Sequence, residues 1–583
     1  MIHELFKRLL PIQIILAAIG TINGIVSGIY GSNFIGSDVM SVIGLYNPVN
    51  MIFTTISTVF LGGTQVLSGK YLGRNEFERT HDIFSLDMII MTLLGLTITF
   101  VLFVFARPIG ILLGADETTI VHLVPYLRGV AIGMIPLFLS QQLSAFLALE
   151  QQSLRTGIGS VVFIAINIIL GYVFVAKMHM GAFGLSLASS IGLWVFTFFL
   201  AQFYFTGKSI MNFKWKGLKL VDVQDILGTG YAGALSFAYQ VVRGFVLNAI
   251  ILKNIGNMGV AALATYTTIN SLLWSFPAGI IAVGRLLLSV SNGEEDKERC
   301  TQIMRTVIFR YAVYDLIFSL GVGLFASQIT GIYYQDPTSP VFEMTKMAIK
   351  LVPPSMFLSI ICVIFISWGQ IIMEHPLVHI LSLIDGLVGT VLFSFLFIST
   401  LKMNAVWISY TFNGILTTIV IYLYAWYNNK ARPKVMADLM MIPKGFGENE
   451  EDIINLEVKR KEDVVLIGKE IQSFCKKKNI DSKRGYYAAL SMEEMASNIL
   501  EHGFTKDNKK HKIDVRVMLK DDDIIMRIKD DCVPFNPKER KDITLDESKE
   551  DPLKNIGIRM AYKLAKDITY EHILGLNVLT ITI

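Results

Sequence analysis

The chain has 583 residues, of which 52% are hydrophobic and 17% are charged, and its mean hydropathy is +0.52. Because soluble domains carry about a quarter charged residues, this composition excludes an ordinary soluble protein and predicts a membrane protein. A net charge of +4 on so long a chain, without a basic stripe, gives no indication of nucleic-acid binding. The four scattered cysteines form neither a disulfide framework nor a Cys/His cluster at metal-ligand spacing.

Apolar segments fill the first 430 residues or so. A helix needs about 20 apolar residues to cross the hydrocarbon core, because it rises 1.5 Å per residue. Pro353-Pro354 should interrupt the helical hydrogen bonds of one such segment. We count twelve candidate spans, near residues 9–31, 40–69, 84–106, 121–148, 157–177, 182–206, 223–251, 260–290, 304–330, 345–371, 377–399 and 404–427.

Lys and Arg residues are distributed unevenly between the loops that join these spans. One set of alternate loops, with Arg74, Arg155 and Arg299 among its residues, holds most of them. Basic residues that flank spans stay on the cytoplasmic side. We therefore expect a multi-pass protein of the plasma (inner) membrane with both termini in the cytoplasm.

The two halves of the membrane part resemble each other at an offset of about 220 residues, which places Gly73 over Gly293. Such a repeat predicts two six-helix lobes, residues 1–220 and 221–429, that form a central cleft. The expected fold is therefore an α-helical polytopic domain of about twelve helices in two pseudo-repeats.

The run from Gly62-Gly63-Thr64 to Arg79 resembles the second helix and following loop of MATE (multidrug and toxin extrusion) transporters. Gly293-Glu294-Glu295-Asp296 resembles its counterpart in their second half. The resemblance covers about residues 10–430 and implies antiport of small organic cations against Na⁺ or H⁺. Many members have an acidic residue late in helix 1, whereas this chain has Ser27 at that place, so the usual coupling acid is missing.

Ionisable residues inside a membrane are functional candidates, because each costs about 2.5–3.5 kcal/mol on insertion scales. Besides Ser27, the transport candidates are Arg243, Asp315 and Asp385, which lie within predicted spans. They either bind substrate or ion, or form internal ion pairs that fix the packing. Three further charges are expected nearer the span ends, at the membrane interface: Asp87, Arg128 and Arg285.

The tail begins with a linker, residues 430–452, rich in charge, Pro and Gly. Residues 453–583 predict a mixed sheet covered on one face by helices over 461–478 and 483–504. No Walker A loop is present.

Three polar segments of this tail have the spacing of a nucleotide site. Glu494, Asn498 and His502 recur every four residues and so share one helix face. Asp530-Asp531-Cys532-Val533-Pro534 follows a predicted strand, and Asn555-Ile556-Gly557 begins a later helix. All three segments hold candidate nucleotide ligands.

These segments resemble the N, G1 and G2 boxes of the GHKL ATPase superfamily, whose α/β sandwich (Bergerat fold) is shared by sensor histidine kinases and anti-sigma-factor serine/threonine kinases. The resemblance implies ATP and Mg²⁺ as ligands: Asn498 would hold Mg²⁺, and Glu494 would be catalytic, acting on the attacking water or acceptor hydroxyl. Asp530 would accept from the adenine amino group. Gly557 would let the backbone approach the phosphates, and Cys532 stands where the family usually has Gly.

No His-containing dimerisation helix precedes the domain, so anti-sigma-factor kinases are the nearer resemblance, with a cytoplasmic protein as phosphoacceptor. The charged segment 538–554 would be the lid over the nucleotide. Whether the tail has kinase activity stays open.

Three functions therefore remain. The first is an ion-coupled exporter regulated by its ATP-binding domain. The second is a sensor serine/threonine kinase whose transporter-like part senses a ligand. The third is a flippase for a lipid-linked precursor.

Overall fold

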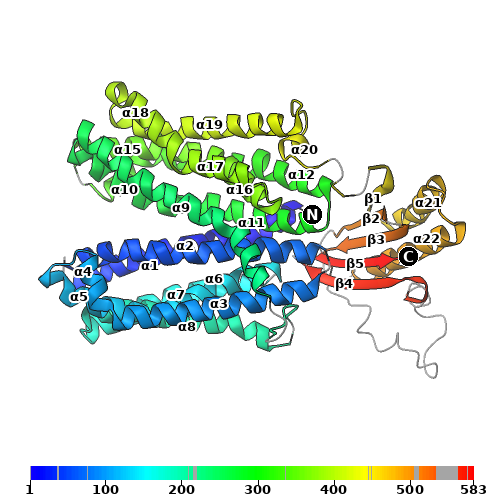
Figure 1. Cartoon of the computed structure of the whole chain (residues 1–583), viewed down its shortest axis with the longest axis horizontal. Helices are drawn as coiled ribbons and strands as arrows, with labels where there is room; N and C mark the ends of the chain where they lie inside the picture. The colour runs from blue at the N-terminus through cyan, green and yellow to red at the C-terminus, as the bar shows by residue number, and fades with distance from the viewer. Residues whose placement is uncertain are drawn as a thin grey trace. The chain divides into compact units, whose positions relative to one another are not determined.

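A computed structural model divides the chain into two compact units (Figure 1): a helical unit of residues 2–148 and 152–442, and a second unit that contains residues 443–583. The structure describes residues 2–35, 38–74, 76–150, 152–207, 209–214, 219–334, 336–443, 446–447, 450–504, 511–520, 522–532, 562–573 and 576–583.

Within its described residues, the helical unit has eleven helices that are long and apolar enough to span a membrane. The number is twelve if the pair Thr119–Ile132 and Met134–Leu149, bent by 44°, is one span. The predicted count is thereby confirmed.

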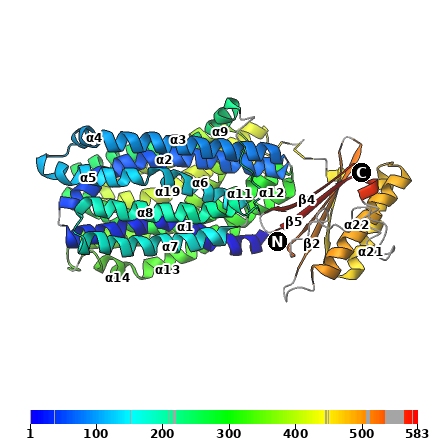
Figure 2. The same cartoon turned by 90° about the horizontal axis from the view of Figure 1, so that it is seen from below.

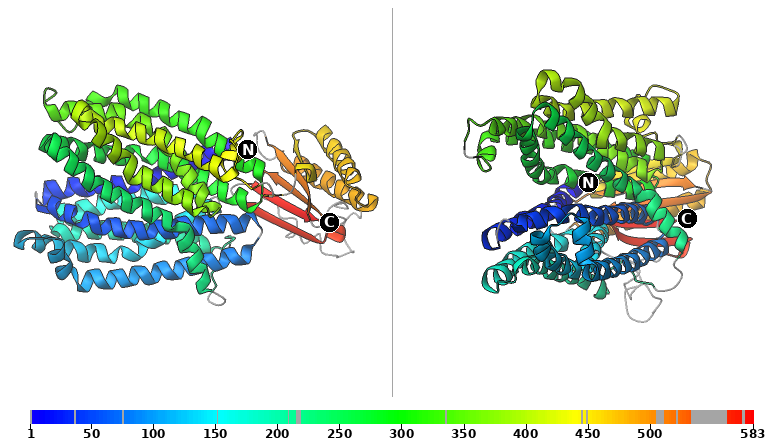
Figure 3. Two further views of the ribbon diagram at one scale, coloured as in Figure 1. Left: turned by 45° about the horizontal axis from the view of Figure 1, so that its top comes forward. Right: turned by 60° about the vertical axis from the view of Figure 1, so that its left-hand side comes forward.

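The first lobe consists of the helices that precede residue 206 (Figure 3). They are α1 (Ile2–Phe34), α2 (Asp38–Gly73), α3 (Phe77–Val104), α4 (Ala106–Leu112), α5 (Glu117–Ile132), α6 (Met134–Leu149), α7 (Ser153–Gly171), η1 (Tyr172–Lys177), α8 (Gly181–Ala201) and η2 (Gln202–Phe205).

The second lobe repeats this arrangement. It consists of α9 (Leu220–Asn254), α10 (Asn257–Leu273), α11 (Ser275–Gly293), α12 (Lys297–Thr306), η3 (Val307–Tyr311), α13 (Ala312–Leu324), α14 (Ala326–Gly331), α15 (Pro340–Leu351), η4 (Pro353–Ser355), α16 (Met356–Ile371), α17 (His375–Leu383), η5 (Ile384–Val388), α18 (Gly389–Leu401) and α19 (Met403–Asn429), followed by the short α20 (Met436–Leu439).

Local backbone geometry follows the internal repeat closely. Phe105 ends α3 with φ −98° and ψ 19°, and Phe325 ends α13 with φ −97° and ψ 14°. A short helix follows each of them, α4 of 7 residues and α14 of 6 residues. Two six-helix pseudo-repeats are therefore present, as the sequence predicts.

Proline positions explain where the observed helices depart from the predicted spans. The predicted span 260–290 is two helices, α10 and α11, which meet at Trp274. Pro277 has no N–H to bond to the preceding turn, so a continuous helix would lose a hydrogen bond there. At Pro353-Pro354 the expected interruption is the 3₁₀ turn η4.

The second unit contains a five-stranded sheet with the order β1-β2-β3-β5-β4. All described strand pairs are antiparallel, so the expectation of a mixed sheet is wrong for these strands. The strands are β1 (Ile453–Val458), β2 (Ile513–Lys520), β3 (Asp523–Asp530), β4 (Asp567–Ile573) and β5 (Leu576–Thr582).

Two helices, α21 (Lys461–Lys477) and α22 (Ser482–His502), cover one face of this sheet (Figure 2). Ile471 of α21 and Met492 of α22 are fully buried against Val517 and Ile528 of the sheet. The fold is thus the helix-on-sheet sandwich that the sequence predicts, with α22 lying over the strands that carry the candidate site.

Candidate functional site

Helix α22 carries the first candidate nucleotide ligands. Met492 and Ala496 are fully buried toward the sheet, whereas Glu494 and Asn498 lie at the partly exposed edge of the helix. Asp481 begins the helix by accepting a hydrogen bond from the Arg484 N–H at 3.2 Å. A carboxylate and an amide are therefore held one turn apart at a position that a ligand can reach.

The C-terminal end of α22 lies against the segment that follows β3. A Cβ added to Gly503 would lie 3.0 Å from both Cβ and Sγ of Cys532. The structure therefore brings together two of the three polar segments, the helix of Asn498 and the strand end at Asp530. Asn555, Gly557 and the expected lid 538–554 lie outside the described residues, and only the backbone of His502 is described.

Asp530 is the last residue of the central strand β3, and its side chain is buried, with 4% of the residue exposed. Its Oδ1 accepts from Asn577 Nδ2 at 2.6 Å and from the Cys532 N–H at 3.0 Å. Burial raises the pKa of Asp530 above its ordinary value, while the Asn577 hydrogen bond opposes that shift. These two bonds hold the carboxylate at the end of β3, where it is a candidate acceptor for an adenine amino group.

Asn577 is a site residue that the sequence reasoning missed. It lies opposite Asp530 in the β3–β5 pairing and is 3% exposed. Its Oδ1 accepts from the Tyr570 hydroxyl at 2.9 Å and lies 2.8 Å from His572 Nδ1. The only signal in the sequence is a single amide inside an otherwise apolar strand.

These residues fit Mg·ATP in the chemistry of their donors and acceptors. A buried carboxylate suits the adenine edge, and an amide oxygen beside a carboxylate suits Mg²⁺, which prefers oxygen ligands. Asn498 and Asp530 are the described residues that would hold the nucleotide, and Glu494 would lie beside them.

In the helical unit, equivalent positions of the two lobes meet where α2 crosses α11. Arg285 Nε donates to Gln65 Oε1 at 3.0 Å, and the two residues are 220 positions apart in the chain. Arg285 is partly buried in this contact, and its expected place at the membrane interface stays a prediction. Arg128 is exposed, with its guanidinium 5.8 Å from the Phe103 ring centroid.

The same crossing continues through small residues at intervals of four. A Cβ on Gly69 would lie 2.9 Å from Ser289 Cβ, and one on Gly73 would lie 2.9 Å from the Gly293 carbonyl carbon. Residues four apart share one helix face, and small residues there let helices approach closely in a membrane. Both pairs keep the repeat offset, so the two lobes contact each other through matching faces.

A second contact between the lobes joins α2 to α9. A Cβ on Gly230 would collide with the Val59 carbonyl and lie 2.9 Å from the Gly63 N. Arg79 of α3 forms a 3.1 Å ion pair with Asp222 of α9, whose side chain is 2% exposed. These contacts lie at the same end of α2 as Gly73, and we call them, together with the α2–α11 crossing, the lobe interface.

The transport candidates Arg243 and Asp385 lie together inside the second lobe. Arg243 Nη1 donates to the backbone carbonyl of Asp385 at 3.1 Å, and its guanidinium lies 5.7 Å from the centroid of the Tyr410 ring. Asp385 Oδ1 accepts from Asn413 Nδ2 at 2.9 Å. The arginine therefore bonds to the carbonyl of Asp385 and not to its carboxylate.

The first lobe has an uncharged cluster at the corresponding place. Asn167 Nδ2 donates to Asn23 Oδ1, and the Ser189 hydroxyl donates to Asn167 Oδ1 at 3.3 Å. Ser27 is buried on α1, four residues beyond Asn23. Where the second lobe pairs Arg243 with Asp385, the first lobe therefore uses amides and a hydroxyl.

Asp315 and Asp87 are buried carboxylates inside helices α13 and α3. Both are 0% exposed, and none of their side-chain oxygens has a hydrogen-bond partner among the described residues. The interfacial place expected for Asp87 stays a prediction. Removing a carboxylate from water is costly unless a proton, a cation or a donor neutralises it, which makes both residues candidate ion sites.

Two helical lobes related by an internal repeat, followed by a helix-on-sheet unit with a buried carboxylate at a central strand end, define the class: a polytopic membrane protein with a C-terminal nucleotide-binding-type domain. The MatE family model matches residues 8–173, and the model described as histidine kinase-like ATPase domain matches residues 458–583.

Known proteins agree with this division. Multidrug export protein MepA of Staphylococcus haemolyticus is 24% identical over 405 residues, which are 64% of this chain and 86% of that protein. Probable multidrug resistance protein NorM of a Synechococcus species is 26% identical over 267 residues, 43% of this chain and 55% of that protein.

Solved structures share the fold of the helical unit at 21% identity. An outward-facing multidrug resistance MATE family transporter of the MOP superfamily aligns with a TM-score of 0.67, and a MOP superfamily transporter from Pyrococcus furiosus with 0.66. Each alignment covers 72% of this chain and 94% of the other. The chain therefore has a MatE domain in its N-terminal part and a histidine kinase-like ATPase domain at its C-terminus, and its helical unit has the fold of MATE transporters.

Proposed function

We propose that this protein is an ion-coupled exporter of small organic compounds whose cytoplasmic domain binds Mg·ATP and regulates transport. The observation that carries the proposal is the lobe interface, in which matching positions such as Gly73 and Gly293 meet. Alternating access needs two such lobes that close at one end and separate again. The names of the relatives, a multidrug export protein and a probable multidrug resistance protein, support small organic substrates.

The distribution of basic residues supports closure on the cytoplasmic side. The lobe interface reaches Lys70 and Gly293, next to loops rich in Lys and Arg. Such loops stay in the cytoplasm, so the lobes are closed toward the cytoplasm. A protein in this state opens its substrate site to the outside, where exported compounds are released.

Asp315 and Asp87 are the proposed sites of the coupling H⁺ or Na⁺. Their carboxylates are buried without hydrogen-bond donors, and a cation or proton would offset the cost of that burial. Asp385 is better satisfied because Asn413 donates to it. We therefore place ion coupling at Asp315 or Asp87 rather than at Asp385, and Asp315 is the first to be tested.

Flux measurements test this assignment. Proteoliposomes loaded with a fluorescent organic cation should show efflux driven by a pH or Na⁺ gradient. Asp315→Asn should lower the initial rate at least about tenfold, which corresponds to about 1.4 kcal/mol, whereas Glu117→Gln, an exposed acid of α5, should not. Equal rates for Asp315→Asn and the wild type would exclude this coupling site.

The C-terminal domain is proposed to bind Mg·ATP through Asp530 at the adenine edge and Asn498 at the metal. Bound ATP would supply a transferable γ-phosphoryl group, and Glu494 lies where it can orient an attacking hydroxyl of a protein acceptor. Glu494→Gln should therefore retain nucleotide binding and lose phosphoryl transfer.

A sensor kinase is the second candidate, and one observation favours it. In the first lobe, the described hydrogen bonds around Asn23 join amides and a hydroxyl, and Ser27, one turn further along α1, stands at the place of the helix 1 acid in the family that the chain resembles. In that case ligand binding to the membrane part would change phosphorylation of a partner protein without any gradient-driven flux. The proteoliposome experiment separates the two functions.

A further inference from the structure

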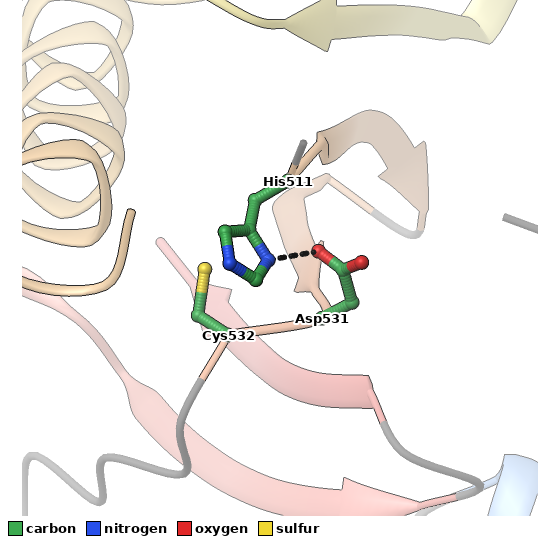
Figure 4. A group of neighbouring side chains, drawn as sticks. All are labelled: His511, Asp531 and Cys532. Carbon is green, nitrogen blue, oxygen red and sulfur yellow. Dashed lines mark hydrogen bonds and ion pairs between the residues drawn. The ribbon is translucent and has the colours of Figure 1, made fainter. Parts of the chain in front are cut away.

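Three side chains that can ligate a metal ion meet beside the nucleotide site. His511 lies two residues before β2, and Asp531 and Cys532 directly follow β3 (Figure 4). The two strands pair antiparallel with Ile513 opposite Asp530, so the residues just outside the pairing must lie side by side. Twenty positions separate His511 from Asp531 in the chain.

Their geometry is compact. The ligand atoms of His511, Asp531 and Cys532 all lie within 4.8 Å of one another, and His511 Nδ1 is 3.1 Å from Asp531 Oδ1. In Figure 4 the imidazole lies between the carboxylate and the sulfur. Rotations of these side chains would turn all three ligand atoms toward one ion without moving a strand.

The cluster is shielded from solvent on one side and open to solvent on the other. His511 and Cys532 are each 6% exposed, and the Phe504 ring centroid lies 5.4 Å from that of His511. The Asp531 side chain is 37% exposed. An ion can therefore enter past Asp531 and come to rest on ligands that are shielded from water.

We propose that His511, Asp531 and Cys532 bind one divalent transition-metal ion of the zinc class. Thiolate, imidazole and carboxylate are the usual ligands of Zn²⁺, and three protein ligands leave a fourth position for water. Mg²⁺ and Ca²⁺ prefer sets of oxygen ligands, so this cluster differs from the proposed Mg²⁺ site at Asn498. Binding requires the Cys532 thiolate, whose proton is released to solvent as the ion binds.

The ion would also restrain the proposed adenine contact. The Cys532 N–H donates to Asp530 Oδ1 at 3.0 Å, and Asn577 Nδ2 donates to the Cys532 carbonyl at 3.1 Å. A metal held by the Cys532 sulfur would fix the backbone that positions Asp530. This step alone depends on the proposed nucleotide function, and through it metal availability would adjust ATP affinity.

Metal titration of the full-length protein tests the site. Detergent-purified protein without a polyhistidine tag, stripped with a chelator, should take up one Zn²⁺ per chain. Substitution with Co²⁺ should give a thiolate-to-cobalt charge-transfer absorption. Cys532→Ser should abolish that absorption, and Cys475→Ser, a matched buried thiol of α21, should keep it. Absence of the band in the wild type, or its persistence in Cys532→Ser, would overturn the proposal.

A milder variant guards against misfolding. Because Asp531 is exposed, Asp531→Asn should melt like the wild type yet bind Zn²⁺ at least about tenfold more weakly, the scale on which groups at metal sites act. Wild-type Zn²⁺ affinity in this variant would count against the site.

ATP affinity measured with and without Zn²⁺ separates the two proposals. We expect a Zn²⁺-dependent shift in the wild type that disappears in Cys532→Ser. If ATP does not bind at all, the proposed nucleotide function fails, while the cobalt band still decides the metal site.

Discussion

The proposed adenine contact of Asp530 would combine ligand binding with a cost to folding. Its carboxylate is buried at the end of β3 and bonded to Asn577. Buried acceptors at binding sites commonly disfavour the folded state until a ligand donates to them. Replacing this residue should therefore change the stability of the folded domain and its ATP affinity in opposite directions.

The variant Asp530→Asn tests this expectation. Burial raises the pKa of Asp530, so the folded domain holds the proton more tightly than the unfolded chain. The free energy of unfolding therefore falls as pH rises from the ordinary value of 3.8 through the folded-state pKa. The variant should lose this pH dependence in thermal melts and be more stable than the wild type at pH 7.

Its ATP affinity should fall by about 10- to 100-fold, because a hydrogen bond to a charged group contributes about 1.5–3 kcal/mol. Calorimetric titration of the full-length protein measures this change. Unchanged affinity would remove Asp530 from the adenine edge.

Asn498→Ala tests the metal position. Loss of the amide oxygen should weaken binding of Mg·ATP at least about tenfold, with a smaller effect on ATP measured without Mg²⁺. Ser497→Ala, next to it on α22, is the matched control and should bind as the wild type does. An equal loss with and without Mg²⁺ would mean that Asn498 does not act through the metal.

Sequence reasoning at this scale found the residues that belong to local motifs. Glu494 and Asn498 could be predicted from the sequence because helical spacing alone places them on one face. Asn577 was missed, since it reaches Asp530 only through strand pairing across 47 residues. The cluster of His511 with Cys532 was missed for the same reason, because spacing along the chain shows no metal motif where a hairpin supplies the proximity.

At the scale of elements, glycines set how closely the lobes approach. Gly230 of α9 lies so near α2 that a Cβ would collide with the Val59 carbonyl. Gly228, two residues earlier on the same helix, has no atom of the described residues within 4 Å of such a Cβ. Replacing glycine by alanine changes the intrinsic helix propensity by the same amount at both positions. The two substitutions therefore form a matched pair.

Gly230→Ala should hold α2 and α9 apart and disfavour the closed lobe interface, whereas Gly228→Ala should not. We expect efflux to fall at least about fivefold in Gly230→Ala, the lower end of coupling energies of about 1–3 kcal/mol. Spin-label distances between α2 and α9 should lengthen in the same variant. Identical distances and rates for the two alanines would mean that this contact does not control closure.

The spans themselves were predictable because apolar length is a local property, and eleven or twelve were found where twelve were expected. Which helices cross one another could not be predicted from the sequence. The repeat offset indicates that Gly73 and Gly293 are equivalent, but their contact depends on how the two lobes face each other, and no periodicity in either helix encodes that. The break at Trp274 was missed because the run from 260 to 290 is apolar enough on average to be counted as one span, although Pro277 lies within it.

At the scale of the whole molecule, the main question is whether ligand binding in one unit changes the equilibrium between states of the other unit. They are compact on their own, with residues 2–148 and 152–442 in one and 443–583 in the other. A ligand can shift transport only by binding two transport states with different affinity. Regulation by ATP therefore requires energetic coupling between the units, in addition to ATP binding.

Deletion of residues 443–583 tests that coupling. The remaining helical unit should assemble and export substrate, but its rate should no longer respond to ATP. Full-length Asn498→Ala should behave in the same way, and this control shows whether the missing nucleotide, rather than the missing chain, is the cause.

Linkage adds a stricter requirement: if ATP changes substrate affinity by a given factor, substrate must change ATP affinity by that same factor. Equilibrium titrations of each ligand at saturating levels of the other measure both factors, and unequal factors would show that the titrations had not reached equilibrium. A factor of one would rule out regulation through binding and leave the membrane part and the ATPase domain as independent units on one chain.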